Sequence, residues 1–195
     1  MTVKSAATGI ITISALAGNA PVLYDFTSLQ TVTVGSGGQT TITFSSIPPT
    51  YTHLQIRWLA RENTGAQADP SQNIRIRFNS DTGSNYSIHR LYGLGSGSGV
   101  ADGYASQSDI VSTGFPGSGN TASVFGAGII DIVDYTNVYK NKTARSLAGV
   151  DINGTGAVWF CSGAWYNTAA INSIELREST YGFGQYSSFA LYGIK

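Results

Sequence analysis

The stretch from Ile76 to Gly93, "IRFNSDTGSNYSIHRLYG", gathers the side chains that most suggest chemistry in this chain. It holds Asp81, two arginines and His89, one of only two histidines. A carboxylate and an imidazole suit acid/base catalysis or metal binding. The other histidine, His53, is far away in sequence, and no Cys-x-x-Cys or His-Glu-x-x-His spacing accompanies the pair. The spacing therefore predicts no zinc site and no bound cofactor.

The segment "NSDTGSN", residues 79–85, has the alternating oxygen side chains of a calcium loop. It lacks the acidic residue that closes such a loop, and Asp-Thr-Gly is a common turn sequence. The pattern favours the turn of a β-hairpin, in which His89 has a hydrogen-bonded structural role.

Catalytic carboxylates have to face a shared substrate. Asp131 and Asp134 are too close along a strand to share a face, whereas a meeting of Asp131 with Glu175 across strands stays open. "GSGSG" at 95–99 matches the Gly-x-Ser-x-Gly pattern but has no strand-to-helix context. Cys161, inside "AVWFCSGAW", is expected to be a buried core residue. We therefore expect a protein that is not an enzyme.

The charge pattern bears on partners. Eleven basic and eleven acidic residues give no net charge and form no block, so we expect no nucleic-acid binding. No stretch reaches the roughly 18 apolar residues that span a bilayer, so we expect no membrane contact. A weakly charged surface is typical of sugar binders and of subunits that pack into assemblies.

Period-two alternation predicts half-buried strands in "THLQIRWLA", "NIRIRF" and "SIELRE". Longer apolar stretches predict central strands: "SVFGAGIIDIVDY", "AVWFCSGAWY" and "YSSFALYGI". The glycine-rich "GSGGQ" predicts a second hairpin turn, and residues 94–121 are expected to be mostly loop. With 24 glycines and one methionine, the fold class is all-β. We expect an antiparallel two-sheet β-sandwich, jelly-roll-like, with an extended N-terminal arm.

Residues 1–20 mimic a secretory signal, but Thr, Ser and Gly dilute their apolar middle. We expect these residues to form an arm that anchors the chain in an assembly, and residues 21–195 to form a single β-sandwich domain. The expected intersubunit contacts are the apolar side chains of the arm: Ile10, Ile11, Ile13 and Leu16.

Aromatic side chains in polar surroundings stack on sugar rings or anchor protein interfaces. Three of them are expected to be exposed on loops and to contact a glycan or a protein partner: Tyr104, Phe115 and Tyr139.

Four blocks of the chain resemble a family of bacteriophage structural proteins, found especially in phages of aquatic bacteria and cyanobacteria. The blocks are "YTHLQIRWLAR", "IRFNSDTGSNYSIHRLYG", "DIVDYTNVYKNKTARSLAG" and "QYSSFALYGIK". Their order and spacing match over about residues 40–195. The resemblance implies a β-sandwich at the virion surface, often a homotrimer, and it does not imply catalysis.

The short N-terminal segment favours a capsid decoration (cement) protein, or a small tail appendage, made in the host cytoplasm and located on the surface of the head or tail. Its expected partners are further copies of itself and the major capsid or tail proteins. One alternative is a receptor-binding module at a tail-fibre tip that recognises host surface glycans. A further alternative is a depolymerase that cleaves such glycans.

Overall fold

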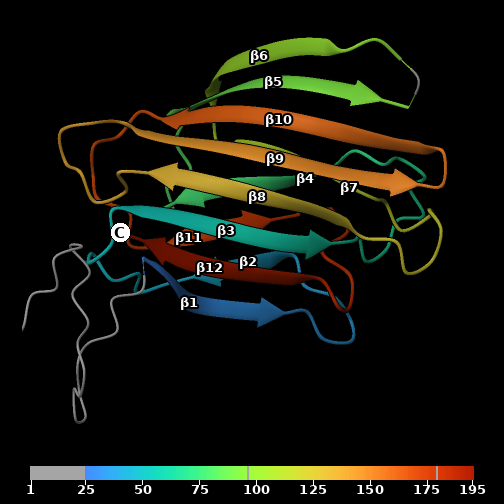
Figure 1. Ribbon diagram of the computed structural model, residues 1–195, viewed down its shortest axis with the longest axis horizontal. Coiled ribbons are helices and arrows are strands. Elements are labelled where there is room, and N and C mark those ends of the chain that lie inside the picture. The colour runs from blue at the N-terminus through green and yellow to red at the C-terminus, as the bar shows by residue number, and fades with distance from the viewer. Residues whose placement is uncertain (1–24, 96, 179) are drawn as a thin grey trace, which may run out of the picture.

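Two antiparallel sheets make up the computed structural model, which describes residues 25–95, 97–178 and 180–195 (Figure 1). The larger sheet has eight strands, in the order β1 (Phe26–Thr33), β12 (Ser188–Ile194), β3 (His53–Ala60), β8 (Gly126–Val133), β9 (Lys142–Ile152), β10 (Thr155–Trp165), β5 (Tyr86–Leu94) and β6 (Val100–Gln107). The smaller sheet has the order β2 (Thr41–Phe44), β11 (Ile174–Arg177), β4 (Gln72–Phe78) and β7 (Ile110–Phe115). The predicted all-β, two-sheet sandwich is confirmed.

The strand pairing is that of a jelly roll with two added hairpins. Strands β1, β2, β3 and β4 pair in turn with β12, β11, β8 and β7, as in a long ribbon folded over on itself. Pairing of β12 with β3 and of β11 with β4 rolls this ribbon into two four-stranded sheets. The hairpins β5–β6 and β9–β10 join through β5 and β10 and lengthen one sheet. We call the eight paired strands the body, and β9, β10, β5 and β6 the extension.

The core lies between the two sheets, where the predicted alternation places it. On β3 the side chains of Leu54, Ile56 and Trp58 are buried, and their neighbours in sequence face outward. The other two alternating stretches are confirmed as β4 and β11. The long apolar stretches form β8, β10 and β12, which all lie inside the larger sheet. Only one face of β8 and β10 is buried, however, so their apolar outer residues meet solvent.

The predicted hairpin at Ile76–Gly93 is wrong, because its two strands belong to different sheets. β4 lies in the smaller sheet and β5 in the larger one, so "NSDTGSN" is an arch that crosses the core. The Tyr86 hydroxyl accepts the Phe78 N–H at 3.2 Å, and both rings are buried. "GSGGQ" likewise joins β1 to β2 across the sheets and forms no hairpin. A turn sequence predicts a reversal, but it does not specify which strands then pair.

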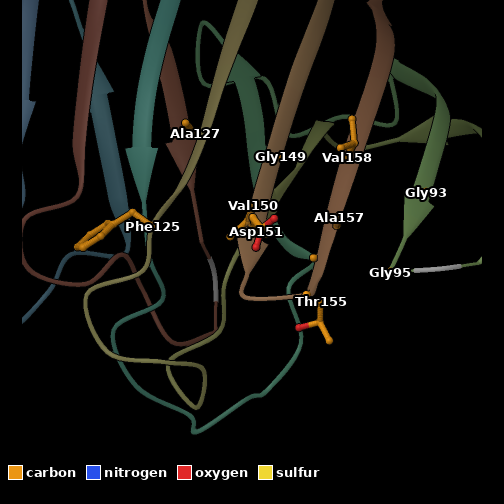
Figure 2. A pocket seen from close by; sticks show the side chains of 12 residues that line it. Gly93, Gly95, Phe125, Ala127, Gly149, Val150, Asp151, Thr155, Ala157 and Val158 are labelled. Carbon is orange, nitrogen blue, oxygen red and sulfur yellow. The ribbon is translucent and has the colours of Figure 1, made fainter.

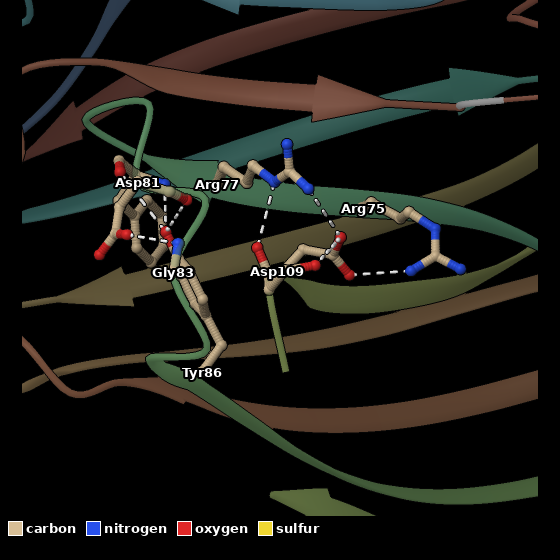
Figure 3. A network of polar contacts seen from close by, with 8 residues as sticks. Arg75, Arg77, Asp81, Gly83, Tyr86 and Asp109 are labelled. Carbon is tan, nitrogen blue, oxygen red and sulfur yellow. Dashed lines mark hydrogen bonds and ion pairs between the residues drawn. The ribbon is translucent and has the colours of Figure 1, made fainter. Parts of the chain in front are cut away.

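Asp81 holds this arch to β10 of the larger sheet, and Figure 3 shows it next to Gly83. Its carboxylate accepts hydrogen bonds from the Trp165 indole at 2.7 Å, the Asn85 amide at 2.9 Å and the Gly83 N–H at 2.8 Å. The Trp165 hydrogen bond is the main reason that the pKa of Asp81 lies below its usual value. The residue that looked most like a catalytic or calcium ligand is therefore occupied in holding a turn.

The region 94–121, expected to be mostly loop, contains the two strands β6 and β7. β7 is buried along its whole length because it lies directly against the inner face of the larger sheet. A Cβ on Gly163 would come within 2.5 Å of Ile110, so glycine is needed for this close approach. The smaller sheet ends at β7, and β5 and β6 project beyond it (Figure 1).

The N-terminal arm and its contacts at Ile10, Ile11, Ile13 and Leu16 lie outside the described residues. The boundary between residues 1–20 and 21–195 therefore stays a prediction.

Candidate assembly and binding surfaces

The outer face of the larger sheet carries a line of exposed apolar side chains that crosses four adjacent strands. Strand register places them side by side, and their exposed fractions lie between 40% and 58%. We call this line the apolar row: Ile129 on β8, Leu147 on β9, Phe160 on β10 and Leu91 on β5. Contiguous apolar surface of this kind marks sites of interaction in soluble proteins.

A line of smaller residues lies beside the apolar row, two residues away on each strand. Register aligns its members as well, and we call it the small row: Ala127 on β8, Gly149 on β9, Val158 on β10 and Gly93 on β5. These residues form part of the floor of an open trough of about 510 Å³ at one end of the extension (Figure 2). Phe125, Asp151 and Gly95 continue the trough beyond the small row. The apolar row therefore forms a ridge, and the trough lies directly beside this ridge on the same face.

Charged groups flank these rows on both sides. Arg145 follows the apolar row on β9 and lies 3.4 Å from the Asp131 carboxylate, which also accepts a hydrogen bond from Gln55 at 2.8 Å. Asp151 lies at the far side of the small row, also on β9, and among the described residues it forms no ion pair. The rows thus have the Arg145–Asp131 ion pair at one side and Asp151 at the other.

The inner side of the extension has a different chemistry. Arg90 on β5 donates two hydrogen bonds to Asp102 on β6, at 2.7 and 2.6 Å. Its guanidinium also lies over the rings of Tyr104 and Trp159, 5.4 Å from each centroid. Tyr92 stacks on Trp159 with centroids 3.8 Å apart. This cluster holds the edge strand β6 to its neighbour, and Arg90 is the main cause that lowers the pKa of Asp102.

The three predicted contact aromatics have different positions. Tyr104 is 48% exposed, but it lies on β6 and not on a loop. Tyr139 is 89% exposed on the connection between β8 and β9, as expected. Phe115 is fully buried at the end of β7, with its ring against Trp58 and Phe183, so its expected exposure is wrong. The strands β9, β10 and β5 separate Tyr104 from Tyr139 in the sheet, so they form no common cluster.

The candidate catalytic groups do not assemble. Asp131 lies on the larger sheet, and Glu175 lies on the smaller sheet, where Ser80 donates to it at 3.0 Å. Cys161 is confirmed as a buried residue, and burial raises the pKa of its thiol. Among the described residues, no group of three or more His, Cys, Asp or Glu side chains is arranged to hold a metal ion.

The two histidines differ in their hydrogen bonding. His89 is exposed on β5 over Gly103, where a Cβ would approach its ring within 2.6 Å, and it forms no hydrogen bond with a described residue. The prediction of a hydrogen-bonded His89 is therefore wrong. His53 instead accepts the Asp134 N–H at 3.0 Å, and Lys140 lowers the pKa of the Asp134 carboxyl.

The buried ammonium of Lys142 was not foreseen from the sequence. It donates to the carbonyl oxygens of Asn137, Lys140 and Thr168 at 2.5, 2.8 and 2.9 Å, and burial lowers its pKa. It ties two connections at one end of the sandwich together, which is a structural role. A lysine in "YKNKTAR" gives no local signal of burial, because its acceptors come from distant segments.

None of the described elements is a helix that could cross a membrane. Comparison with known proteins finds no relative: no family model, no curated protein and no solved structure matches this chain. Its function therefore has to be inferred from the surfaces themselves, and the outer face of the larger sheet offers the most extensive candidate.

Proposed function

We propose that this chain is a non-enzymatic structural protein of the bacteriophage virion surface, which acts by packing against further copies and other virion proteins. The observation that carries the proposal is the apolar row on an otherwise solvent-facing sheet. An isolated soluble domain gains nothing from four aligned apolar side chains in water, whereas a subunit buries them in its assembly.

Two further features support the same proposal. Jelly-roll sandwiches are the architecture of many viral capsid domains as well as of lectins. The four sequence blocks that resemble phage structural proteins lie on β3, on the arch with β4 and β5, on β8 and β9, and on β12. They include Leu91 and Leu147 of the apolar row, whereas Ile129 and Phe160 lie outside the blocks.

Mass spectrometry and a stained gel of purified virions test the proposal. We expect the chain in the particle, at a copy number comparable to that of the major capsid protein if it decorates the capsid. A few tens of copies would instead indicate a tail appendage. Absence from purified virions would contradict the proposal.

Glycan binding at a tail-fibre tip is the second candidate, and Tyr104 favours it. Its ring is half exposed beside the Arg90–Asp102 pair, and an aromatic ring next to charged hydrogen-bonding groups is suited to a sugar. If this candidate is right, Tyr104→Ala abolishes binding on a host-glycan array and Tyr139→Ala, its control, does not. Release of reducing sugars from host polysaccharide would support a depolymerase instead.

A further inference from the structure

We propose that the outer face of the larger sheet packs against the same face of a second copy, through a two-fold axis that runs between the apolar row and the small row. The inference rests on the proposed function, because it names the first partner of the surface that carries that function. Its basis is the match between the two rows, strand by strand.

The match follows from a two-residue offset on each strand. On the same face and two residues away, Ala127 lies next to Ile129, Gly149 next to Leu147, and Gly93 next to Leu91. A two-fold axis parallel to the rows exchanges them while keeping each strand opposite its own copy. Every large side chain of three strands then meets alanine or glycine of the partner, and Phe160 on β10 meets Val158.

The trough has room for the apolar row of a second copy. A Cβ built on Gly93 or on Gly95 has no atom within 4 Å, so the volume above these glycines is open. Neither the sheet nor its connections fill the trough within the described residues, and Figure 2 shows bare backbone at Gly93 and Gly149 beside the Val158 side chain. The ridge of one copy can therefore enter the trough of the other without displacing a side chain.

The positions of two charged residues are consistent with the same two-fold axis. Arg145 and Asp151 lie on β9 on opposite sides of the two rows, each two residues beyond its row. The rotation that places Leu147 over Gly149 also places Arg145 of each copy opposite Asp151 of the other. An isologous interface makes this contact twice, and it gives Asp151 the ion-pair partner that it lacks among the described residues.

The size of the face is adequate for a stable dimer. The outer face over the five strands from β3 to β5, and over the seven residues from Arg145 to Asp151, spans about 24 Å by about 24 Å, or roughly 600 Å² of flat area. Projecting side chains increase the accessible area above this value, toward the ~800 Å² per partner of standard interfaces. Aligned sheet packing turns the two sheets by about 30°, so the fit is best on the central strands β9 and β10.

Sedimentation equilibrium of the full chain between about 1 and 100 µM tests the inference. We expect the wild-type chain to form dimers in this range. Leu147→Asp places a charge in the ridge, and Gly93→Leu fills the trough without backbone strain. Both are expected to weaken dimerisation at least about a hundredfold. Val138→Asp, a matched apolar-to-acid change on an exposed connection between β8 and β9, leaves it unchanged.

Crosslinking tests the register. Phe160→Cys and Val158→Cys chains, mixed in equal amounts and oxidised, are expected to give a disulfide-linked heterodimer, and neither variant gives one alone. Circular dichroism of each variant verifies that the sandwich has folded; Leu147, Phe160 and Val158 are exposed enough for this to hold.

A wild-type chain that stays monomeric at 100 µM, or that forms trimers without dimers, would overturn the inference. So would an equal loss of dimer in the Val138→Asp control, or crosslinking of Phe160→Cys with itself. A dimer with the expected register in a protein absent from virions would refute the proposed function alone. A virion protein that shows no such dimer would refute this inference alone.

Discussion

The body and the extension of this sandwich are built from the same kind of strand, yet the smaller sheet covers the inner face of the extension only in part: β7 packs against β9 and β10, and most of β5 and β6 lies beyond it. Body strands such as β3 and β4 bury one complete face between the sheets. In the extension, β5 and β6 project beyond β7, and they keep half-exposed residues such as Tyr104 on the inner face and Leu91 on the outer one. The strands that face the smaller sheet therefore supply the core, and the part of β5 and β6 that lies beyond β7 supplies surface on both faces.

The position of the extension explains why it can take this second task. It consists of two hairpins inserted at β4–β7 and at β8–β11 of a closed jelly-roll pattern, and each insertion leaves the pairing of the eight body strands intact. Insertions between paired elements are tolerated because they need not disturb the core. The inserted strands therefore widen the outer face of the larger sheet, on which the apolar row runs from β8 of the body across β9, β10 and β5.

Removal of a large side chain tests this division most strongly. Phe78→Ala empties a fully buried site of the body next to Trp165, and we expect it to lower the free energy of unfolding by about 3–5 kcal/mol. Phe160→Ala on the outer face of the extension is expected to change it by less than about 0.5 kcal/mol. Urea denaturation at micromolar or lower concentration measures both. Equal losses would mean that the extension is as important for stability as the body.

A smaller and more local effect is expected at the edge of the extension. Arg90→Ala removes two hydrogen bonds to a charged partner, each worth about 1.5–3 kcal/mol when protected from solvent. We expect at least about tenfold faster hydrogen exchange of the β6 amides, with the β3 amides unchanged. Arg75→Ala is the matched control, because Arg75 on β4 pairs with Asp109, which immediately precedes β7, and not with a residue of β6 (Figure 3). Uniformly faster exchange in both sheets would contradict a separable extension.

The smallest expected effect is a difference in acid sensitivity. Asp81 on the arch at 79–85 and Asp102 on the edge strand β6 both have pKa values below the usual 3.8 of an aspartate. Because the folded state lowers the pKa, each carboxylate stabilises the fold above about pH 4 and loses this contribution as the pH falls through the folded value. We expect the free energy of unfolding to fall less steeply below pH 4 in Asp81→Asn than in the wild type. In Asp102→Asn, we expect only the hydrogen exchange of the β6 amides to depend less on acid.

Denaturation and exchange series at pH 7, 4 and 3 measure this pair. A change in global stability of similar size for the two variants would indicate that body and extension unfold as one unit. A changed exchange rate of the β6 amides in Asp81→Asn would indicate that the arch at 79–85 also stabilises the extension.

Individual residues show how far the sequence predicts this molecule. The alternation of Leu54, Ile56 and Trp58 located β3 and its buried face, because period two is a local property of a strand. Phe115 was misplaced since its neighbours are glycine, proline and serine, which suggest a loop although the strand they follow is buried. The arch at 79–85 was taken for a hairpin because turn residues do not specify the partner of the next strand.

The candidate surfaces were harder to foresee. Tyr104 was identified as an exposed aromatic, but the sequence did not connect it with Arg90 on β5 or Trp159 on β10, which come from two other strands. The apolar row was hidden for a different reason. Ile129 and Phe160 occur in long apolar stretches that predicted central strands, whereas Leu147 and Leu91 lie outside these stretches. Only the strand register aligns the four side chains.

The sequence by itself determined the all-β class, the places of the main strands and the buried face of each alternating strand, because these follow from local side-chain period and turn chemistry. Only the tertiary structure decided that the ribbon rolls up as a jelly roll, that the extension projects past β7, and that Leu147 and Phe160 stand in line on an open face. Strand partners and register depend on contacts between residues far apart in the chain. No local pattern contains them, and the proposed interface is a property of that register.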